Sequence, residues 1–548
     1  MKTPSVGIDQ NREGKFVDRY WGRVPMYTHI VPETLNTNSP IVECNEDYVQ
    51  LFFGYLDGSL NLSNISMELQ AELKDLVNKL PSYGRIPLPL LDPFFECAIG
   101  PKDPDMQCSM IADKNCHPIV TKEGCYLSIP SSSPWDNIYF TDADPASYGI
   151  YVIDWRSTPM NLVDHVATLG QNPHSIDRAV FSSRMFIRTQ NSYSFDVFDA
   201  QTREMIKSVD LGFKPRTTGD PNKLLNIQLI AGNDHPKIAV IDVMYDDLII
   251  DVVGVDKRPG QTPVGNQGGS TSGHPAWFDS HHFGLIDRLN GVVKVFEVKE
   301  TGNLPKRFVI TQKQELVTPT GTHTIDSDVI HTDLTRDNEF FVVSEGFAGS
   351  GKSPGIHKLL WQGNRLIYAK DSSGNLIEQY MPAPSDDQDA SHHYGHQLKT
   401  NEIWYPTFKS KKMWVMDAET LTVKREYDVG YGAGHVSFSY TWGYACVTNH
   451  FDNVVTIVDM RDNTTVHQIV VNTEPTIPAT HLIQTHENKI LPREDEYPLD
   501  ADAGKYYFLG VTTPTGGEFK RIDLEALRGG STVIETLVTG GHPEQSTS

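Results

Sequence analysis

From about residue 140 onward, short runs of Val, Ile, Tyr and Phe recur along the chain, and turn-forming residues bound each run. Runs of this length and composition predict β-strands. One unit repeats: a strand, a short polar turn, a strand that ends in Asp, another turn and a further strand. The unit occurs in SYGIYVIDWRS, SYSFDVFDAQTREMIKSVDL, PKIAVIDVMYDDLIIDVV, KKMWVMDAETLTVKREYDV and NVVTIVDMRDNTTVHQIVV.

The spacing of these units is irregular, at roughly 40–70 residues, which is typical of β-propeller blades of about four strands joined by variable loops. We therefore predict an all-β fold, a seven-bladed β-propeller that spans residues 141–548. A β-sandwich would also contain short strands, but the repeated strand–Asp–turn–strand unit favours the propeller.

Residues 1–140 form a different segment, irregular and rich in Pro and Gly, which we predict to be a loop-rich extension with one helix. The stretch SMELQAELKDLVNKL predicts that helix, because Ser66 can cap it and apolar residues follow at helical spacing. The apolar stripe consists of Met67, Leu69, Leu73, Leu76, Val77 and Leu80.

The six cysteines match neither a CxxC metal motif nor a haem attachment site. Five of them cluster in the extension, where we predict disulfides and hence an oxidising compartment; these are Cys44, Cys97, Cys108, Cys116 and Cys125. One of the five is then left unpaired or pairs with Cys446, although the YACVTN context favours a small buried residue for Cys446.

The chain is acidic, with 47 Lys and Arg against 70 Asp and Glu, a net charge of −23. This charge argues against nucleic acid or an anionic membrane as partner. No apolar run approaches the roughly 18–20 residues of a membrane span, and the N-terminus has no hydrophobic signal core. The protein is therefore either cytoplasmic or, as we expect, periplasmic with its signal peptide absent from this sequence.

The stretch GFAGSGKS matches a nucleotide-binding P-loop, but its context does not. A P-loop must open a helix whose N-terminal amides hold the phosphates. Pro354 and Gly355 follow the motif directly, without a helical pattern after them. We interpret this stretch as a loop between two strands.

The 20 histidines are numerous for this length, and several stand just before a predicted inner strand of a blade. Those in such positions are His174, His331, the group His392, His393 and His396, His435 and His481, with a further group at His274, His281 and His282. A single histidine before a strand is usually a turn residue. A similar placement in five blades is harder to explain by turns alone.

In a propeller, the inner strands of all blades begin at the same end of the central channel. Histidines placed there converge on the axis as a ring of imidazoles, which are ligands suited to Cu, Zn and Fe. Because six or more exceed what one tetrahedral zinc uses, the ring predicts a multinuclear copper centre.

The motifs GAGHVSFS, ACVTNHFDNVVTIVD, HPAWFDSHHFGLIDR and HHYGHQ resemble the propeller domain of nitrous oxide reductase, which binds a multinuclear copper cluster through histidines. That enzyme ends in a cupredoxin domain with paired cysteines, whereas the only late cysteine here is Cys446. A propeller of this kind without the cupredoxin domain is similar to thiocyanate dehydrogenase.

The resemblance implies a copper centre, with three ions expected, that oxidises thiocyanate with water to cyanate and sulfur and releases two electrons. It implies six metal ligands: His174, His282, His331, His393, His435 and His481. It also implies catalytic side chains nearby, for which Asp279, Asp333 and Lys102 are the candidates. The electrons would pass to an external acceptor such as a cytochrome c. The oligomeric state is left open, with a homodimer as one alternative.

Three other functions remain open. One is nitrous oxide reduction by a relative that lacks the cupredoxin domain. Another is a non-catalytic propeller of the YVTN type that binds a protein or carbohydrate and contains no stoichiometric metal. The third, an iron propeller oxygenase of the carotenoid-cleaving type, needs four histidines, and its characteristic motifs are not evident in this sequence.

Overall fold

The structure is a computed structural model, which describes residues 137–547 with gaps and a hairpin before them. The hairpin pairs β1 (His117–Thr121) with β2 (Gly124–Ser128). The gaps are residues 179–183, 201, 219–221, 223–224, 226, 244–246, 262–269, 280, 302–307, 318–326, 332–338, 345–354, 381–393, 398, 472–482, 485–488, 493–501 and 514. The helix predicted within residues 66–80 and the side chains of the five clustered cysteines lie outside the described part.

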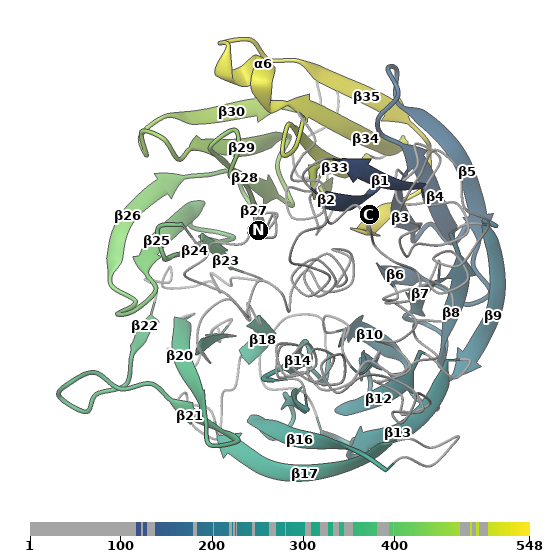
Figure 1. Cartoon of the computed structure of the whole chain (residues 1–548), viewed down its shortest axis with the longest axis vertical. Helices are drawn as coiled ribbons and strands as arrows, with labels where there is room; N and C mark the ends of the chain where they lie inside the picture. Colours follow the sequence, from purple (N-terminus) through teal and green to yellow (C-terminus); the bar gives the residue numbers. More distant parts are fainter. Residues whose placement is uncertain are drawn as a thin grey trace, which may run out of the picture.

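Eight antiparallel sheets surround a common axis as the blades of a propeller (Figure 1). From the axis outward, blade 1 contains β36 (Pro543–Thr547), β3 (Asn137–Asp142), β4 (Gly149–Asp154) and β5 (Asn161–Ala167). Blade 2 contains β6 (Pro173–Arg178), β7 (Arg184–Thr189), β8 (Ser194–Asp199) and β9 (Glu204–Asp210). Blade 3 contains β10 (Pro215–Thr218), β11 (Ile227–Gly232), β12 (Lys237–Asp242) and β13 (Leu248–Gly254). Blade 4 contains β14 (Ala276–Trp277), β15 (His282–Asp287), β16 (Val292–Glu300) and β17 (Phe308–Val317).

The remaining four blades follow in the same order, and two of them have an additional strand. Blade 5 contains β18 (Ser327–His331), β19 (Glu339–Ser344), β20 (Gly355–Gln362) and β21 (Arg365–Tyr368), with β22 (Glu378–Tyr380) beside β20. Blade 6 contains β23 (Gly395–Gln397), β24 (Glu402–Thr407), β25 (Lys412–Asp417) and β26 (Val423–Asp428). Blade 7 contains β27 (Ala433–Ser439), β28 (Tyr444–Asn449), β29 (Val454–Asp459) and β30 (Val466–Val470). Blade 8 contains β31 (Ile483–Gln484), β33 (Tyr506–Thr513), β34 (Gly516–Asp523) and β35 (Ile534–Val538), with β32 (Lys489–Leu491) beside β33.

The all-β propeller prediction is confirmed, but the prediction of seven blades is wrong, because the structure has eight. The repeated sequence unit marks only blades 1, 2, 3, 6 and 7. Blades 4 and 5 lack the unit because their third strands end in Glu300 and Gln362 and not in Asp. In blade 8, Asp523 at the end of β34 is the N-cap of α6. The inner strands of blades 4 and 8 also have only two residues each. Blade 1 carries the unit in β4, although its inner strand comes from residues much later in the chain.

The Asp that ends the repeated unit closes the turn after the third strand of a blade. Asp154 accepts hydrogen bonds from the N–H groups of Arg156 and Ser157 at 3.0 and 3.2 Å. Asp459 accepts one from the N–H of Arg461 at 2.9 Å. A carboxylate that binds backbone N–H groups two and three residues later favours a tight turn over continued strand. This local interaction explains why the pattern is visible in the sequence.

Hydrophobic packing lies between the blades, and each of the eight interfaces has its own buried cluster. Between blades 2 and 3, for example, Phe186 and Phe195 pack against Ile230 and are fully buried. Cys446 lies in the cluster between blades 7 and 8, where burial raises the pKa of its thiol. The prediction that Cys446 is a small buried residue is confirmed.

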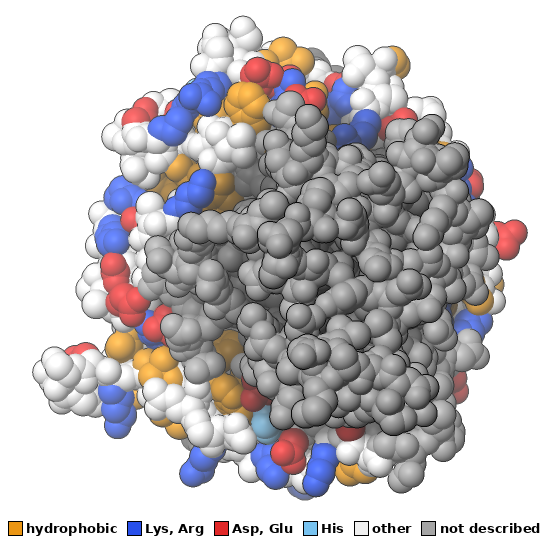
Figure 2. Space-filling view, in the orientation of Figure 1, with side chains coloured by type: hydrophobic (Ala, Val, Ile, Leu, Met, Phe, Trp, Pro, Cys, Tyr) orange, Lys and Arg blue, Asp and Glu red, His pale blue; other side chains and the backbone are white. Residues whose placement is uncertain are grey.

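Basic and acidic side chains are interspersed around the rim of the face shown in Figure 2. In the part of the chain that the structure describes, α6 (Leu524–Arg528) is the only α-helix. No helix among those residues has the length and apolar character needed to cross a membrane.

Two strands that lie far apart in the sequence close the ring. β36 pairs with β3, and the C-terminus lies beside β3 (Figure 1). The buried carboxylate of Asp142, at the end of β3, secures this closure by accepting hydrogen bonds from Ser147 Oγ at 2.6 Å, from the N–H of His542 at 2.7 Å and from His165 Nε2 at 3.0 Å. Burial alone would raise the pKa of Asp142, but these hydrogen bonds outweigh it and lower the pKa to about 2.

We expect Asp142→Asn to lower the free energy of unfolding by about 2 kcal/mol at pH 7, the equivalent of the shift in pKa. A carboxyl with a lowered folded-state pKa contributes stability above its unfolded value of about 4 and loses it as the pH falls towards about 2. Urea unfolding of both proteins at pH 7 and pH 3 checks this, because the difference should shrink at pH 3. An equal difference at both values would contradict the assignment.

Gly541 offers a second test of the closure, since its φ is +67° and an added Cβ would overlap the Tyr151 hydroxyl and the Asp142 carboxylate. Gly212 is the matched control, with φ at +71° and open space where a Cβ would stand. We expect Gly212→Ala to cost about 1 kcal/mol through backbone strain alone. Gly541→Ala should cost roughly 1–3 kcal/mol more through steric overlap. Equal unfolding midpoints for the two variants would show that the closure tolerates the extra methyl group.

Candidate functional site

The inner strands of several blades share a backbone hydrogen bond. This hydrogen bond identifies the residues that occupy equivalent positions in different blades. In blades 1, 2, 3 and 7, the residue after the second strand donates its N–H to the carbonyl just before the inner strand, and in blade 4 it donates to the carbonyl just before the isolated bridge at Ser272, which precedes β14. The five bonds, 2.7–3.0 Å long, join Ala143 to His542, Gln190 to Asn172, Asn233 to Lys214, Arg288 to Thr271 and His450 to Gly432. Equivalent residues of different blades can therefore be compared directly.

An extra residue follows this hydrogen bond in several inner strands and forms a β-bulge. In blade 2 the bulged residue is His174, because Pro173 pairs with Thr189 and Ser175 with Arg188. In blade 7 it is Gly434, since Ala433 pairs with Asn449 and His435 with Thr448. His174 and His435 thus stand at the same end of their inner strands, one position apart. Bulges often occur next to functional sites, where they redirect a side chain.

His174 lies against a carboxylate of the neighbouring blade. Its Nδ1 is 3.3 Å from Oε2 of Glu544, on the inner strand of blade 1. The two side chains are largely buried, with exposed fractions of 13% and 22%. Glu544 was not among the residues predicted from the sequence, and it reaches the site only because the C-terminal strand completes blade 1.

His435 lies against His450, which was not among the residues predicted from the sequence. The two ring centroids are 5.5 Å apart and the ring planes are at 85°. His450 follows β28 and is buried, with Phe408 of blade 6 also against its ring at 5.7 Å. Gly434 makes this arrangement fit, because a Cβ there would overlap the His450 ring. The GAGH motif therefore combines a glycine that admits one imidazole with the histidine that contacts it.

Blade 4 has the same strand register, and it places a histidine other than the predicted one at the position of His435, with Arg288 at the position of His450. Ser272 pairs with Asp287 as Ala433 pairs with Asn449, so Gly273 and His274 correspond to Gly434 and His435. The two blades share a sequence motif, which is S-G-H in blade 4 and A-G-H in blade 7. No prediction from the sequence was based on this similarity. His282 instead begins β15 and lies beside Phe278, whose N–H donates to the His282 carbonyl at 2.8 Å. Phe278 comes four residues after His274, which is roughly 13 Å along the blade at about 3.3 Å per residue. His282 stands towards the opposite end of the blade from His435.

At that opposite end, His282 belongs to a contact between blades 4 and 5. Its Nδ1 lies 2.9 Å from both carboxylate oxygens of Asp279. Trp361 Nε1 and the N–H of His281 also donate to Asp279, at 3.0 and 2.7 Å. Burial tends to raise the pKa of Asp279, but the hydrogen bonds from His282 and His281 outweigh it and lower the pKa. A carboxylate held in this way is a weak base, and it orients the His282 ring.

The remaining predicted residues can be placed only in part. His331 is the last residue of β18, and its side chain lies outside the described part of the structure, as do all atoms of Lys102, Asp333, His393 and His481. Among the described residues, no group of three or more His, Cys, Asp or Glu side chains is arranged to bind a metal ion. The structure thus describes individual members of the predicted ring and not the complete ring.

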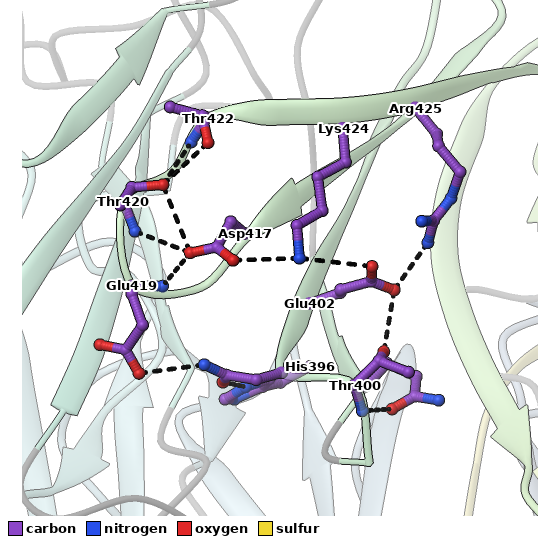
Figure 3. A network of polar contacts seen from close by, with 11 residues as sticks. His396, Thr400, Glu402, Asp417, Glu419, Thr420, Thr422, Lys424 and Arg425 are labelled. Carbon is purple, nitrogen blue, oxygen red and sulfur yellow. Dashed lines mark hydrogen bonds and ion pairs between the residues drawn. The ribbon is translucent and has the colours of Figure 1, made fainter.

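His396, from the same cluster as His393, is held in a polar network of blade 6 (Figure 3). Its Nε2 lies 3.0 Å from Oδ1 of Asn401, whose amide donates to Glu419. In the same network, Glu402 accepts hydrogen bonds from Arg425 at 2.7 Å and from Thr400 at 2.8 Å. These contacts join the turns at one end of the blade, so His396 has a structural role there.

No family model matches the chain, and no curated protein sequence matches it. Among solved structures, it is similar to dihydro-heme d1 dehydrogenase NirN in complex with DHE, with a TM-score of 0.51, 12% identity and coverage of 94% of this chain and 93% of that one. Others are apo AztD from Citrobacter koseri (0.45, 9%, covering 75% and 97%) and the periplasmic gluconolactonase PpgL of Pseudomonas aeruginosa (0.43, 13%, covering 61% and 99%). At 12% identity, the likeness to NirN supports the fold alone.

The contact between Gly434 and His450 can be tested with a double-mutant cycle. We expect Gly434→Ala to lower the free energy of unfolding by roughly 1–3 kcal/mol, because the added methyl group must displace the buried ring. In a His450→Ala background the same substitution should cost much less, since the ring is gone. Urea unfolding of the four proteins measures the coupling. Equal costs in both backgrounds would show that the strain at residue 434 has another source.

Proposed function

We propose that this chain is a copper-dependent oxidoreductase of the thiocyanate dehydrogenase type. One thiocyanate ion and one water molecule give cyanate, sulfur, two protons and two electrons. The electrons pass to an external carrier such as a cytochrome c, and the reaction takes place in the periplasm. The small anion would bind near the propeller axis, at the end of the inner strands where His174 and His435 stand.

One observation carries the proposal: two of the predicted ligands, His174 and His435, occupy the same end of the inner strands of blades 2 and 7. Imidazole nitrogens in this setting fit the ligand preference of copper. His174 has a carboxylate beside it, as metal-binding histidines commonly do. His274 and His450 extend the same end of the propeller with further imidazoles.

The chain's own residues have distinct tasks in this proposal. Copper, when bound, supplies sites that accept electrons and makes a bound water more acidic. His174 and His435 hold it, with His331, His393 and His481 as further ligands. His282 and Asp279 fit a supporting role better than direct contact, because they stand towards the other end of blade 4 and Asp279 is a weak base. Asp333 remains the candidate to accept a proton from water, and Lys102 to attract the anion.

Metal content and turnover of the purified full-length chain test the proposal. We expect about three copper ions per chain, bound mainly by imidazole. His174→Ala and His435→Ala should each lower copper content and thiocyanate turnover together, with turnover falling at least tenfold. His467→Ala is the control, because His467 lies on the outermost strand of blade 7 and should leave both unchanged.

Each other outcome points to a different function. Normal copper content and turnover in both variants would overturn the assignment of these ligands. Turnover of nitrous oxide without turnover of thiocyanate would favour the reductase alternative. A chain that binds no copper would favour a non-catalytic propeller that binds a protein or carbohydrate.

A further inference from the structure

The C-terminal strand brings Glu544 to the histidine of the neighbouring blade. β36 pairs with β3 in blade 1, and the register shifts by one residue between the Phe140 and Asp142 pairs, where Glu544 lies. His174 occupies the bulge of the adjacent inner strand. The two bulges stand side by side, and Nδ1 of His174 and Oε2 of Glu544 are 3.3 Å apart.

This contact selects between the two nitrogens of the imidazole. A carboxylate beside Nδ1 favours the imidazole tautomer that is protonated on Nδ1. Nε2 then carries the free lone pair. Metal-binding histidines typically have such a carboxylate at the nitrogen that does not bind the metal, and the carboxylate fixes the ring orientation and raises ligand basicity. His282 shows the same pairing with Asp279 at 2.9 Å, so the chain uses it at both ends of the propeller.

We propose that Glu544 is the positioning residue of His174: it holds the proton on Nδ1 and so presents Nε2 as the ligand atom. The copper part of this inference rests on the proposed function, whereas the tautomer part does not. It follows that closing the ring and preparing the His174 ligand are one event, because β36 supplies both the closing strand and the carboxylate.

Histidine-selective ¹⁵N NMR of the metal-free full-length chain at pH 8 tests the tautomer directly. His174→Ala identifies the His174 signals by their loss. We expect the wild-type His174 to carry its proton on Nδ1, Glu544→Gln to give a mixture of tautomers and Glu544→Asp to restore part of the preference. A wild-type His174 protonated on Nε2, or one unchanged by Glu544→Gln, would overturn the proposal whether or not the chain binds copper.

Copper affinity, measured by competition with a chelator, tests the consequence. Glu544→Gln should weaken binding 10–100-fold. In a His174→Ala background it should cause no further loss, because Glu544 acts through His174. Glu518→Gln is the matched control: Glu518 is 22% exposed like Glu544, and its partner Lys520 lies with it on β34. An equal loss with and without His174 would contradict a positioning role, and failure of the wild type to bind copper would count against the proposed function alone.

Discussion

The whole propeller depends on one long-range pairing, between β36 and β3, that closes the ring. The hydrogen bond from His542 to Asp142 joins residues 400 positions apart. For an unstructured chain, closing such a loop costs about 5 kcal/mol of conformational entropy. The intervening blades lower that cost, because each one packs against the next and turns the chain towards its own beginning. The buried carboxylate of Asp142 then binds the backbone of the last segment, the side chain of His165 and the turn at Ser147.

Packing between blades explains why no single core dominates the molecule. Each interface has its own apolar cluster, and polar contacts cross several of them. Trp361 of blade 5 donates to Asp279 of blade 4, and Lys358 of blade 5 donates to the Ala418 carbonyl of blade 6. Arg521 of blade 8 reaches the Ser157 carbonyl of blade 1. In such a ring, stability is distributed over many similar interfaces, as in repeat proteins, but without exposed terminal repeats.

The sequence was informative wherever the controlling interaction is local. In blades such as 1 and 7, the Asp that ends the third strand forms hydrogen bonds within three residues, so the repeated unit and the propeller fold could be recognised from it. The number of blades could not, because the third strands of blades 4 and 5 do not end in Asp and the inner strands of blades 4 and 8 are very short. The choice of His282 over His274 has a similar cause. Proximity in sequence put both in one cluster, whereas the strand register places His282 beside Phe278, four residues along the blade from His274.

The origin of β36 also sets an order in time. Because synthesis proceeds from the N-terminus, the strands of blades 2 to 8 are made before β36, which completes blade 1. Parts of a protein begin to fold during synthesis. His435 and its neighbour His450 belong to a single blade and can meet as soon as blade 7 has formed. His174 is synthesised with blade 2, but its contact with Glu544 can form only after β36 has been synthesised. A chain that ends before β36 would therefore retain most of its blades, but the contact between His174 and Glu544 could not form.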